Sequence, residues 1–412
     1  MENSINIREL RGLDIANRYT IKQENGFFFI PSSSGKSERY KVCLKSQKCT
    51  CPDFEIRRKK CKHIFAAEFY FENEFLKELT AEEITVPQTY VPKRKTYPQI
   101  WAAYDKAQMS EKSEFQFLLA ELCKGVGEPA QYNGRPRLAL EDMLFSCAFK
   151  VYSTFSGRRF TTDLKEAKEK GFISNAANHT SISRYFSMEM LTPYLKMLIE
   201  ETSLPLAEIE KRFAVDASGL STTVGFTWLH AKFTEPRLID KRDWLKIHIC
   251  TGVKTNIISA VEVTERFESD SNHFDPLVKA TVQNFEMEEI SADKAYLSKA
   301  NLQTAVENNA VPYIAWKSNS KATNKEGNHL WNKLFHWYAL NQEKFFEHYH
   351  QRSNVETTFS MIKAKFGGSL RSKTRTAQIN EALCKILAHN ICVLIQSMHE
   401  LGIEPKFWRD TI

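Results

Sequence analysis

The feature that most constrains this chain is a group of four potential metal ligands close to its start. Cys49, Cys51, Cys61 and His63 form the pattern Cys-x-Cys, nine residues, Cys-x-His. Zn²⁺ prefers four nitrogen or sulfur ligands in a tetrahedron, and a complete set of four protein ligands leaves no open coordination position. The pattern therefore predicts one structural zinc ion. The alternative interpretation is a set of reduced structural cysteines without a metal.

Five basic residues lie between or beside these ligands, namely Arg57, Arg58, Lys59, Lys60 and Lys62. The lysines would lower the pKa of the neighbouring thiols and so favour the thiolate form that binds metal. The same row of positive charges suits a phosphate backbone. A solvated charged face is the other interpretation of this row.

The residues around the cluster predict a small folded module. Short strands are expected before it, with turns at Gly26 and residues 32–37, and a helix is expected over residues 64–75. We expect Cys43 to be a strand residue outside the ligand set. From about residue 15 to 75 the segment resembles the SWIM zinc finger, a small ββα module associated with nucleic-acid or protein binding. Metal binding would supply most of the folding free energy of such a module, on the order of 10 kcal/mol.

Composition and charge argue against several other classes of protein. No run of about 18 apolar residues occurs, so no membrane span is expected, and the first residues lack the apolar core of a secretory signal. From the lack of such a signal we expect a reducing compartment. The nine cysteines cannot all pair within one chain. The 57 Lys and Arg exceed the 50 Asp and Glu and give a net charge of +7, which is compatible with a polyanionic partner.

The finger is expected to occupy residues 1–78, and the chain then changes character. Residues 79–99 contain three prolines and a Lys-Arg-Lys run, which is typical of a linker. Residues 100–207 are predicted to be helical, with a first helix ended by Gly125 and Gly127.

A later helix of this region is expected to be capped by Thr180 or Ser181. The region offers several side chains suited to DNA: Arg158, Arg159, Arg184 and Tyr185. A helix-turn-helix DNA reader and a plain helical bundle both fit this pattern.

Strand and helix patterns alternate over residues 208–405, which predicts a mixed α/β domain. The alternation fits an RNase H-like fold, and on its own it fits many other α/β folds as well. An apolar strand is expected to run into Asp216, where small residues suggest a turn. A later strand is expected to end at Asp293, and Lys317 follows the next one. The loop with Asp270, His273 and Asp275 is either an accessory metal site or an acidic loop.

The segment from Tyr349 to Lys363 is the most informative part of the chain. Tyr349, Arg352, Glu356 and Lys363 follow the spacing Y-x2-R-x3-E-x6-K. At about 100° per residue, the last three fall within about 40° of one another on a helix. A surface salt-bridge ladder would explain Arg352 and Glu356, because opposite charges at i,i+4 attract. It would not require Tyr349 or Lys363.

This signature resembles that of a large group of bacterial insertion-sequence transposases with a DDE catalytic triad. The resemblance covers roughly residues 100–400, and the finger at the front is not a standard part of the group. It implies that Asp216, Asp293 and Glu356 are the catalytic, metal-binding carboxylates of an RNase H-like domain. Carboxylates gathered in one pocket repel one another. Two Mg²⁺ (or Mn²⁺) ions about 3.5–4 Å apart would neutralise them and support phosphoryl transfer.

The resemblance also implies how DNA is held. Arg352 and Lys363 would bind phosphates near the cleavage point, Tyr349 would stack on a base, and Lys317 would line the DNA path. The expected activity is cleavage of transposon ends and strand transfer into target DNA. The expected protein is a bacterial cytoplasmic, nucleoid-associated homo-oligomer.

Two alternatives stay open. One is a catalytically inactive, transposase-derived DNA-binding zinc-finger protein. The other is a nuclease or resolvase on the same fold.

Overall fold

The computed structural model describes most of the chain and divides it into two compact units. The first unit comprises Met1–Arg94 and Met287–His350, and the second comprises Lys95–Glu286 and Gln351–Ile412. The described residues are 7–24, 26–32, 39–76, 100–131, 133–134, 136–222, 243–322 and 328–408. The expected linker at 79–99 lies outside them, and so does the expected turn at 32–37 apart from Ser32.

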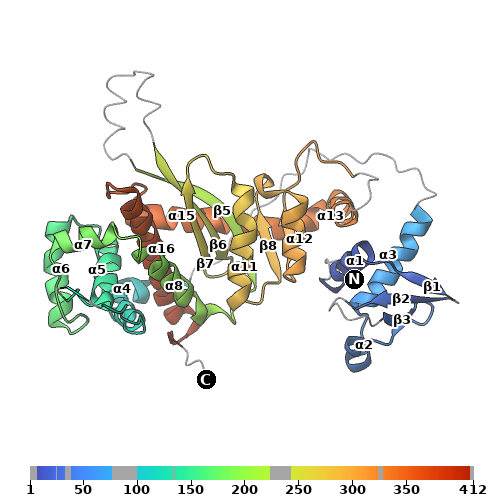
Figure 1. Cartoon of the computed structure of the whole chain (residues 1–412), viewed down its shortest axis with the longest axis horizontal. Coiled ribbons are helices and arrows are strands. Elements are labelled where there is room, and N and C mark those ends of the chain that lie inside the picture. The colour runs from blue at the N-terminus through green and yellow to red at the C-terminus, as the bar shows by residue number, and fades with distance from the viewer. Residues whose placement is uncertain are drawn as a thin grey trace, which may run out of the picture. The chain divides into compact units, whose positions relative to one another are not determined.

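The N-terminal part of the first unit is a four-stranded antiparallel sheet with three helices (Figure 1). In chain order its elements are α1 (Ile7–Arg18), β1 (Lys22–Glu24), β2 (Phe27–Pro31), β3 (Arg39–Cys43), β4 (Lys48–Cys49), α2 (Pro52–Arg57) and α3 (Lys62–Leu76). The module is therefore larger than the expected ββα unit. Every second residue of β2 is buried, so Phe28 and Ile30 form a core with Val42 and Ile64.

A glycine lets two helices of this module approach closely. A Cβ on Gly12 of α1 would lie 2.5 Å from Cβ of Phe65 and 2.7 Å from the carbonyl oxygen of Lys62. Both of these atoms belong to α3, so any side chain at residue 12 would force the helices apart. Cys43 ends β3, as expected of a strand residue.

The second part of the first unit is a parallel βαβ arrangement followed by two helices. Its elements are β8 (Glu289–Ala292), the 3-10 turn η3 (Lys294–Tyr296), α12 (Lys299–Glu307), β9 (Val311–Ile314), α13 (His329–Leu340) and α14 (Gln342–Tyr349). Helix α1 contacts α12 and α13. The amide of Gln303 donates to Asp14 at 2.7 Å, and Lys333 pairs with Glu9 at 2.6 Å.

The second unit begins with a group of helices, as the sequence predicts for residues 100–207. They are α4 (Trp101–Lys124), α5 (Leu140–Ser153), α6 (Gly157–Glu169), α7 (His179–Phe186), α8 (Leu191–Ser203) and the short η1 (Leu204–Leu206). Gly125 caps α4, as expected. The expected cap of α7 at Thr180 or Ser181 is wrong, because the carboxamide oxygen of Asn178 accepts the N–H of Thr180 and starts the helix.

The strands of the second unit form an antiparallel meander. β5 (Arg212–Ser221), β6 (Trp244–Gly252) and β7 (Ile258–Glu265) pair in that order. The expected turn after Asp216 is wrong, because β5 continues through Ser221. Asp216 is paired with Ile249, and the small residues after it remain in register with β6.

The remaining elements of the second unit are helical. They are η2 (Asp270–His273), α11 (Phe274–Asn284), η4 (His350–Arg352, which straddles the division of the units), α15 (Ser353–Phe366) and α16 (Arg375–Leu401). Helix α16 spans 27 residues, and most of them are buried because it packs against α4, α5 and α8 (Figure 1). Thr374 caps its start through a side-chain hydrogen bond to the N–H of Ala377, and Gly402 ends it with φ of 68°.

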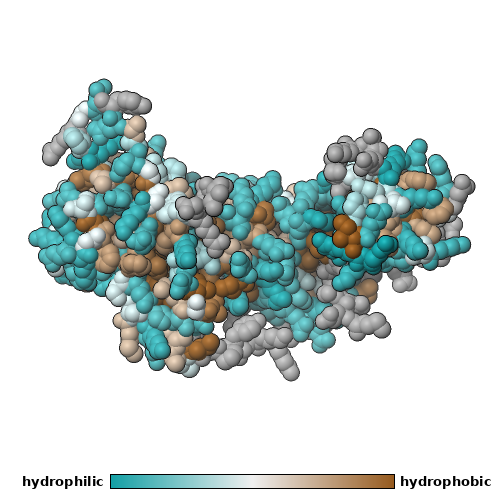
Figure 2. Space-filling model, turned by 90° about the horizontal axis from the view of Figure 1, so that it is seen from below, coloured by the Kyte–Doolittle hydropathy of each residue, from teal (hydrophilic) through white to brown (hydrophobic). Residues whose placement is uncertain are grey.

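The face of the molecule shown in Figure 2 is largely polar. In Figure 2, hydrophilic residues cover most of the face shown, and hydrophobic ones gather in small groups. Among the described residues, no helix is both long enough and apolar enough to cross a membrane.

Candidate functional site

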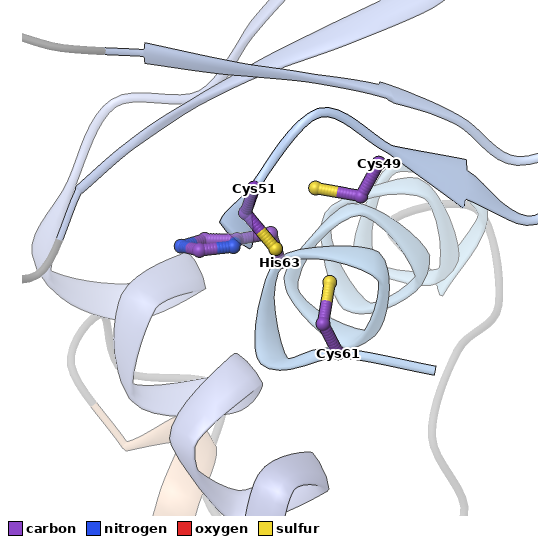
Figure 3. A group of neighbouring side chains, drawn as sticks. All are labelled: Cys49, Cys51, Cys61 and His63. Atoms are coloured by element: carbon purple, nitrogen blue, oxygen red, sulfur yellow. The ribbon is translucent and has the colours of Figure 1, made fainter. Parts of the chain in front are cut away.

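The four predicted zinc ligands converge in the first unit. The sulfur atoms of Cys49, Cys51 and Cys61 and a ring nitrogen of His63 all lie within 4.8 Å of one another, and all four residues are buried (Figure 3). Neither ring nitrogen of His63 has a hydrogen-bond partner among the residues that the structure describes. A buried imidazole without a partner is costly, and a metal ion would supply one. Three thiols and one imidazole therefore fit Zn²⁺.

Local structure explains why these side chains meet. Cys49 ends β4, and Cys51 caps α2, where its sulfur accepts the N–H of Phe54 at 3.4 Å. Cys61 immediately precedes α3, and its carbonyl accepts the N–H of Ile64. His63 is the second residue of that helix. A turn presents one pair and a helix start presents the other, as the spacing predicts.

Interactions among the thiols set the electrostatics of the cluster. Hydrogen bonds from Cys49 and Cys51 lower the pKa of Cys61, and the hydrogen bond with Cys51 raises the pKa of Cys49. The expected cause, the neighbouring lysines, is not the main one. Lys60 instead pairs with Glu68 at 2.6 Å.

Two predicted catalytic residues meet in the second unit. Arg352 donates from one guanidinium nitrogen to Asp216 at 3.0 Å and from the other to Glu356. Asp216 lies on β5, while Glu356 lies in the first turn of α15. Arg352 and Asp216 are about one-fifth exposed and Glu356 is half exposed. The two carboxylates, 140 positions apart in sequence, therefore share one cation, and all three side chains are partly exposed.

Lys363 extends this cluster along the same strand. Its ammonium group donates to the hydroxyl of Ser218 at 2.7 Å, and burial lowers its pKa. Within the described parts of the chain, Lys363 forms no salt bridge. Asp216 and Ser218 are two residues apart on β5, so their side chains leave the same face of the strand. Both side chains contact residues of the segment 352–363. Ser218 could not be predicted as a partner, because nothing near it in sequence indicates Lys363.

The helix expected to carry Arg352, Glu356 and Lys363 on one face begins only after Arg352. Tyr349 ends α14, His350–Arg352 form the 3-10 turn η4, and α15 begins at Ser353. Arg352 is therefore the residue before the helix and not a member of its face, although it still pairs with Glu356 at i,i+4.

The other predicted site residues belong to the first unit. Asp293 directly follows β8, where its carboxylate accepts the N–H of Lys294 at 2.7 Å. Lys317 is exposed beyond β9, which ends earlier than expected at Ile314. The ring of Tyr349 stacks on Phe345, with centroids 5.8 Å apart.

The loop that suggested an accessory metal site is organised by an ion pair. Lys246 pairs with Asp270 at 2.6 Å, and the rings of His248 and His273 stack with centroids 4.2 Å apart. Burial lowers the pKa of His248 to about 4. Among the described residues, Asp270, His273 and Asp275 do not form a group of converging metal ligands, which favours the acidic-loop interpretation.

The predicted DNA-contacting arginines of the helical region are exposed to solvent, and its predicted tyrosine is buried. Arg158, Arg159 and Arg184 are exposed on α6 and α7. Tyr185 is buried, and its hydroxyl donates to the carbonyl of Leu138. It is therefore a core residue and not a candidate for contacting DNA.

Comparison with known proteins finds two family models that match parts of this chain. Residues 208–391 match the family described as transposase DDE domain, and residues 40–71 match the SWIM zinc finger. No curated protein and no solved structure matches the chain. The first match contains Asp216, Asp293 and Glu356, and the second contains all four residues of the cysteine and histidine cluster.

Proposed function

Because this chain carries a transposase DDE domain and a SWIM zinc finger, we propose that it is a DNA transposase that cleaves transposon ends and joins them to target DNA. The observation that carries the proposal is that Asp216 and Glu356 both form a salt bridge with Arg352. Two acidic residues far apart in sequence are held together inside the matched domain, and both are accessible to a substrate.

We propose that residues 208–405 form an RNase H-like catalytic domain. Three antiparallel strands (β5, β6, β7) are followed in the chain by α11, β8, α12, the parallel strand β9 and further helices. This order of elements fits such a fold. In the same proposal, residues 1–78 are the finger, 79–99 a linker and 100–207 a helical region that contacts DNA.

The proposed catalytic residues are Asp216, Asp293 and Glu356. Carboxylate oxygens are the protein ligands that Mg²⁺ and Mn²⁺ prefer. The salt bridges of Asp216 and Glu356 with Arg352 support a site in which these carboxylates share positive charge. Two such ions, when bound, activate the attacking hydroxyl or water and stabilise the leaving oxygen. The three carboxylates hold and orient the reacting groups, and no covalent protein–DNA intermediate is required.

The neighbouring residues would position the DNA. Lys363 lies beside the shared carboxylates, forms no salt bridge with the described residues, and so can bind a phosphate near the cleavage point. Arg352 would exchange its carboxylates for a phosphate once divalent ions neutralise the site. Tyr349 would stack on a base, and Lys317 would contact the backbone farther along.

The finger is proposed to bind one structural Zn²⁺ through Cys49, Cys51, Cys61 and His63. Two transposon ends must be cut together, which favours a homo-oligomer. The proposed setting is the bacterial cytoplasm, on the nucleoid.

The test is a nicking and strand-transfer assay on the DNA that flanks the reading frame, with Mg²⁺ or Mn²⁺. Asp216→Asn, Asp293→Asn and Glu356→Gln keep side-chain size and remove charge. Each is expected to lower the rate at least about 100-fold, as loss of a metal-binding group does, while affinity for the DNA is retained. Asp275→Asn is the matched control, since this carboxylate forms an i,i+4 salt bridge with Lys279 at 2.7 Å on α11. It is expected to leave the rate unchanged.

Other outcomes would separate the alternatives. Binding of flanking DNA without metal-dependent cutting would contradict the proposal and indicate a DNA-binding protein. Cutting without joining would indicate a nuclease or resolvase.

A further inference from the structure

A cavity of about 350 Å³ lies in the second unit, between α5, α6, α7 and the start of α16. This volume is within the range of ligand sites. Its lining is strongly basic for so small a space, because it includes Lys150, Arg371 and Lys373 as well as His179. None of these residues belongs to the cluster around Asp216.

Lys150 is the cation that most requires an explanation. Burial lowers its pKa, and its ammonium group forms no salt bridge or side-chain hydrogen bond with the described residues. The side chain is partly buried, and the carboxylate of Glu381 attracts its charge without a direct ion pair. A partly buried charge without a direct partner is unfavourable. An anion in the cavity would provide that partner.

The acidic residue of the cavity is already engaged. Both carboxylate oxygens of Glu381 accept the N–H of Arg371 at 3.0 Å, and one also accepts the N–H of Ser372 at 2.7 Å. Glu381 thus holds the loop that carries Arg371 and Lys373. With three cations against this one carboxylate, the cavity keeps an excess of positive charge.

Three helices begin at this cavity. Gly157 is the first residue of α6, His179 is the first of α7, and Thr374 caps α16. A Cβ on Gly157 would lie 3.4 Å from Cβ of His179, so the first two helix starts are in contact. Helix starts carry partial positive charge and unpaired N–H groups, which adds to the field of the side chains.

We propose that this cavity binds a phosphate group of the DNA backbone. The proposal rests on the proposed function, because it names the DNA contact of the helical region. Duplex DNA is favoured over a free nucleotide because exposed Arg158 and Arg159 directly follow Gly157. They extend the basic surface beyond the cavity, as a continuous backbone requires. The cavity fixes one phosphate, and the exposed arginines follow its neighbours.

The experiment measures binding of a fluorescent duplex from the flanking DNA to the full-length protein by anisotropy, without Mg²⁺ and at several salt concentrations. Lys150→Met and Lys373→Gln are compared with Lys168→Gln, an exposed lysine on α6 outside the cavity. Lys150→Met and Lys373→Gln are each expected to raise Kd about fivefold to tenfold. Each should also reduce the slope of log Kd against log salt by about one, as loss of one phosphate contact does. Lys168→Gln should change neither quantity.

Lys373→Gln, at an exposed position, keeps the test valid if Lys150→Met fails to fold. A Kd within twofold of the control and an unchanged slope for a folded cavity variant would overturn the proposal. A second result would also overturn it. If inorganic phosphate or ATP stabilises the protein against unfolding in a way that depends on Lys150, while Lys150→Met leaves duplex binding unchanged, the ligand is a free anion. This experiment measures binding and not cutting, so it tests the cavity separately from the proposed catalysis. If the protein never cuts DNA but its binding still depends on Lys150, the proposed catalysis is refuted and the proposed phosphate site is supported.

Discussion

Replacement of Cys61 by serine tests how the N-terminal module is stabilised. Cys61 is fully buried at the centre of the four converging ligands. A serine hydroxyl does not replace a thiolate as a zinc ligand, so Cys61→Ser is expected to release the metal. We predict that the module from about residue 15 to 75 then unfolds.

The magnitude follows from the contents of the module. Its core is a small group of apolar side chains around Phe28, Ile30 and Val42, and a core of this size rarely supplies more than about 3–5 kcal/mol. A bound Zn²⁺ would supply on the order of 10 kcal/mol. Without it, the two buried ring nitrogens of His63 remain unpaired, at about 1–3 kcal/mol each. The balance therefore favours the unfolded module by several kcal/mol.

The assay combines zinc content per chain with hydrogen exchange over residues 39–76. Wild type is expected to hold one zinc ion and to protect this segment, and Cys61→Ser is expected to do neither. Cys43→Ser is the matched control, because Cys43 lies on a neighbouring strand of the same sheet outside the ligand cluster. Unchanged zinc content in Cys61→Ser, or equal loss in Cys43→Ser, would refute the reasoning.

Two further predictions concern stability. Burial lowers the pKa of both His248 and His389 to about 4, so their stabilisation is present above the unfolded pKa of about 6.5 and is lost as pH falls toward 4. Urea denaturation should show that the free energy of unfolding falls by up to about 1.4 kcal/mol per histidine per pH unit in this window. His389→Gln should remove about half of this pH dependence, and an unaltered pH dependence would contradict the prediction. Gly12→Ala should cost about 1–3 kcal/mol or more by forcing α1 from α3, measured as lost exchange protection of α3. Gly127→Ala, with no atom within 4 Å of the added Cβ, should leave stability unchanged. Exchange protection of α3 equal to wild type in Gly12→Ala would refute the packing argument.

Local sequence was sufficient where a structure depends on near neighbours. The ligands Cys49 to His63 are brought together by one strand end and two helix starts within a few residues, so their spacing alone predicts the cluster. Gly125 ends α4 as expected, because few residues other than glycine and proline interrupt a helical pattern so strongly.

Local sequence was misleading where a distant partner decides the structure. The small residues after Asp216 resemble a turn, yet pairing with β6 keeps them in a strand, and tertiary context overrides propensity. Lys363 donates a hydrogen bond to Ser218, which lies 145 positions away in sequence. The basic cavity likewise combines Lys150 with the segment near Arg371, and no local pattern predicts that association.

The central claim is that Asp216, Asp293 and Glu356 surround the same divalent ions, and site-directed radical cleavage tests it most directly. Fe²⁺ replaces the bound ions in the full-length protein, and ascorbate with peroxide then cuts the backbone near the iron. Mass spectrometry locates the cuts. The account predicts cuts close to all three residues, competed by Mg²⁺ and all lost together in Asp216→Asn. Cuts near only one of them, or cuts near Asp293 that persist in Asp216→Asn, would contradict it.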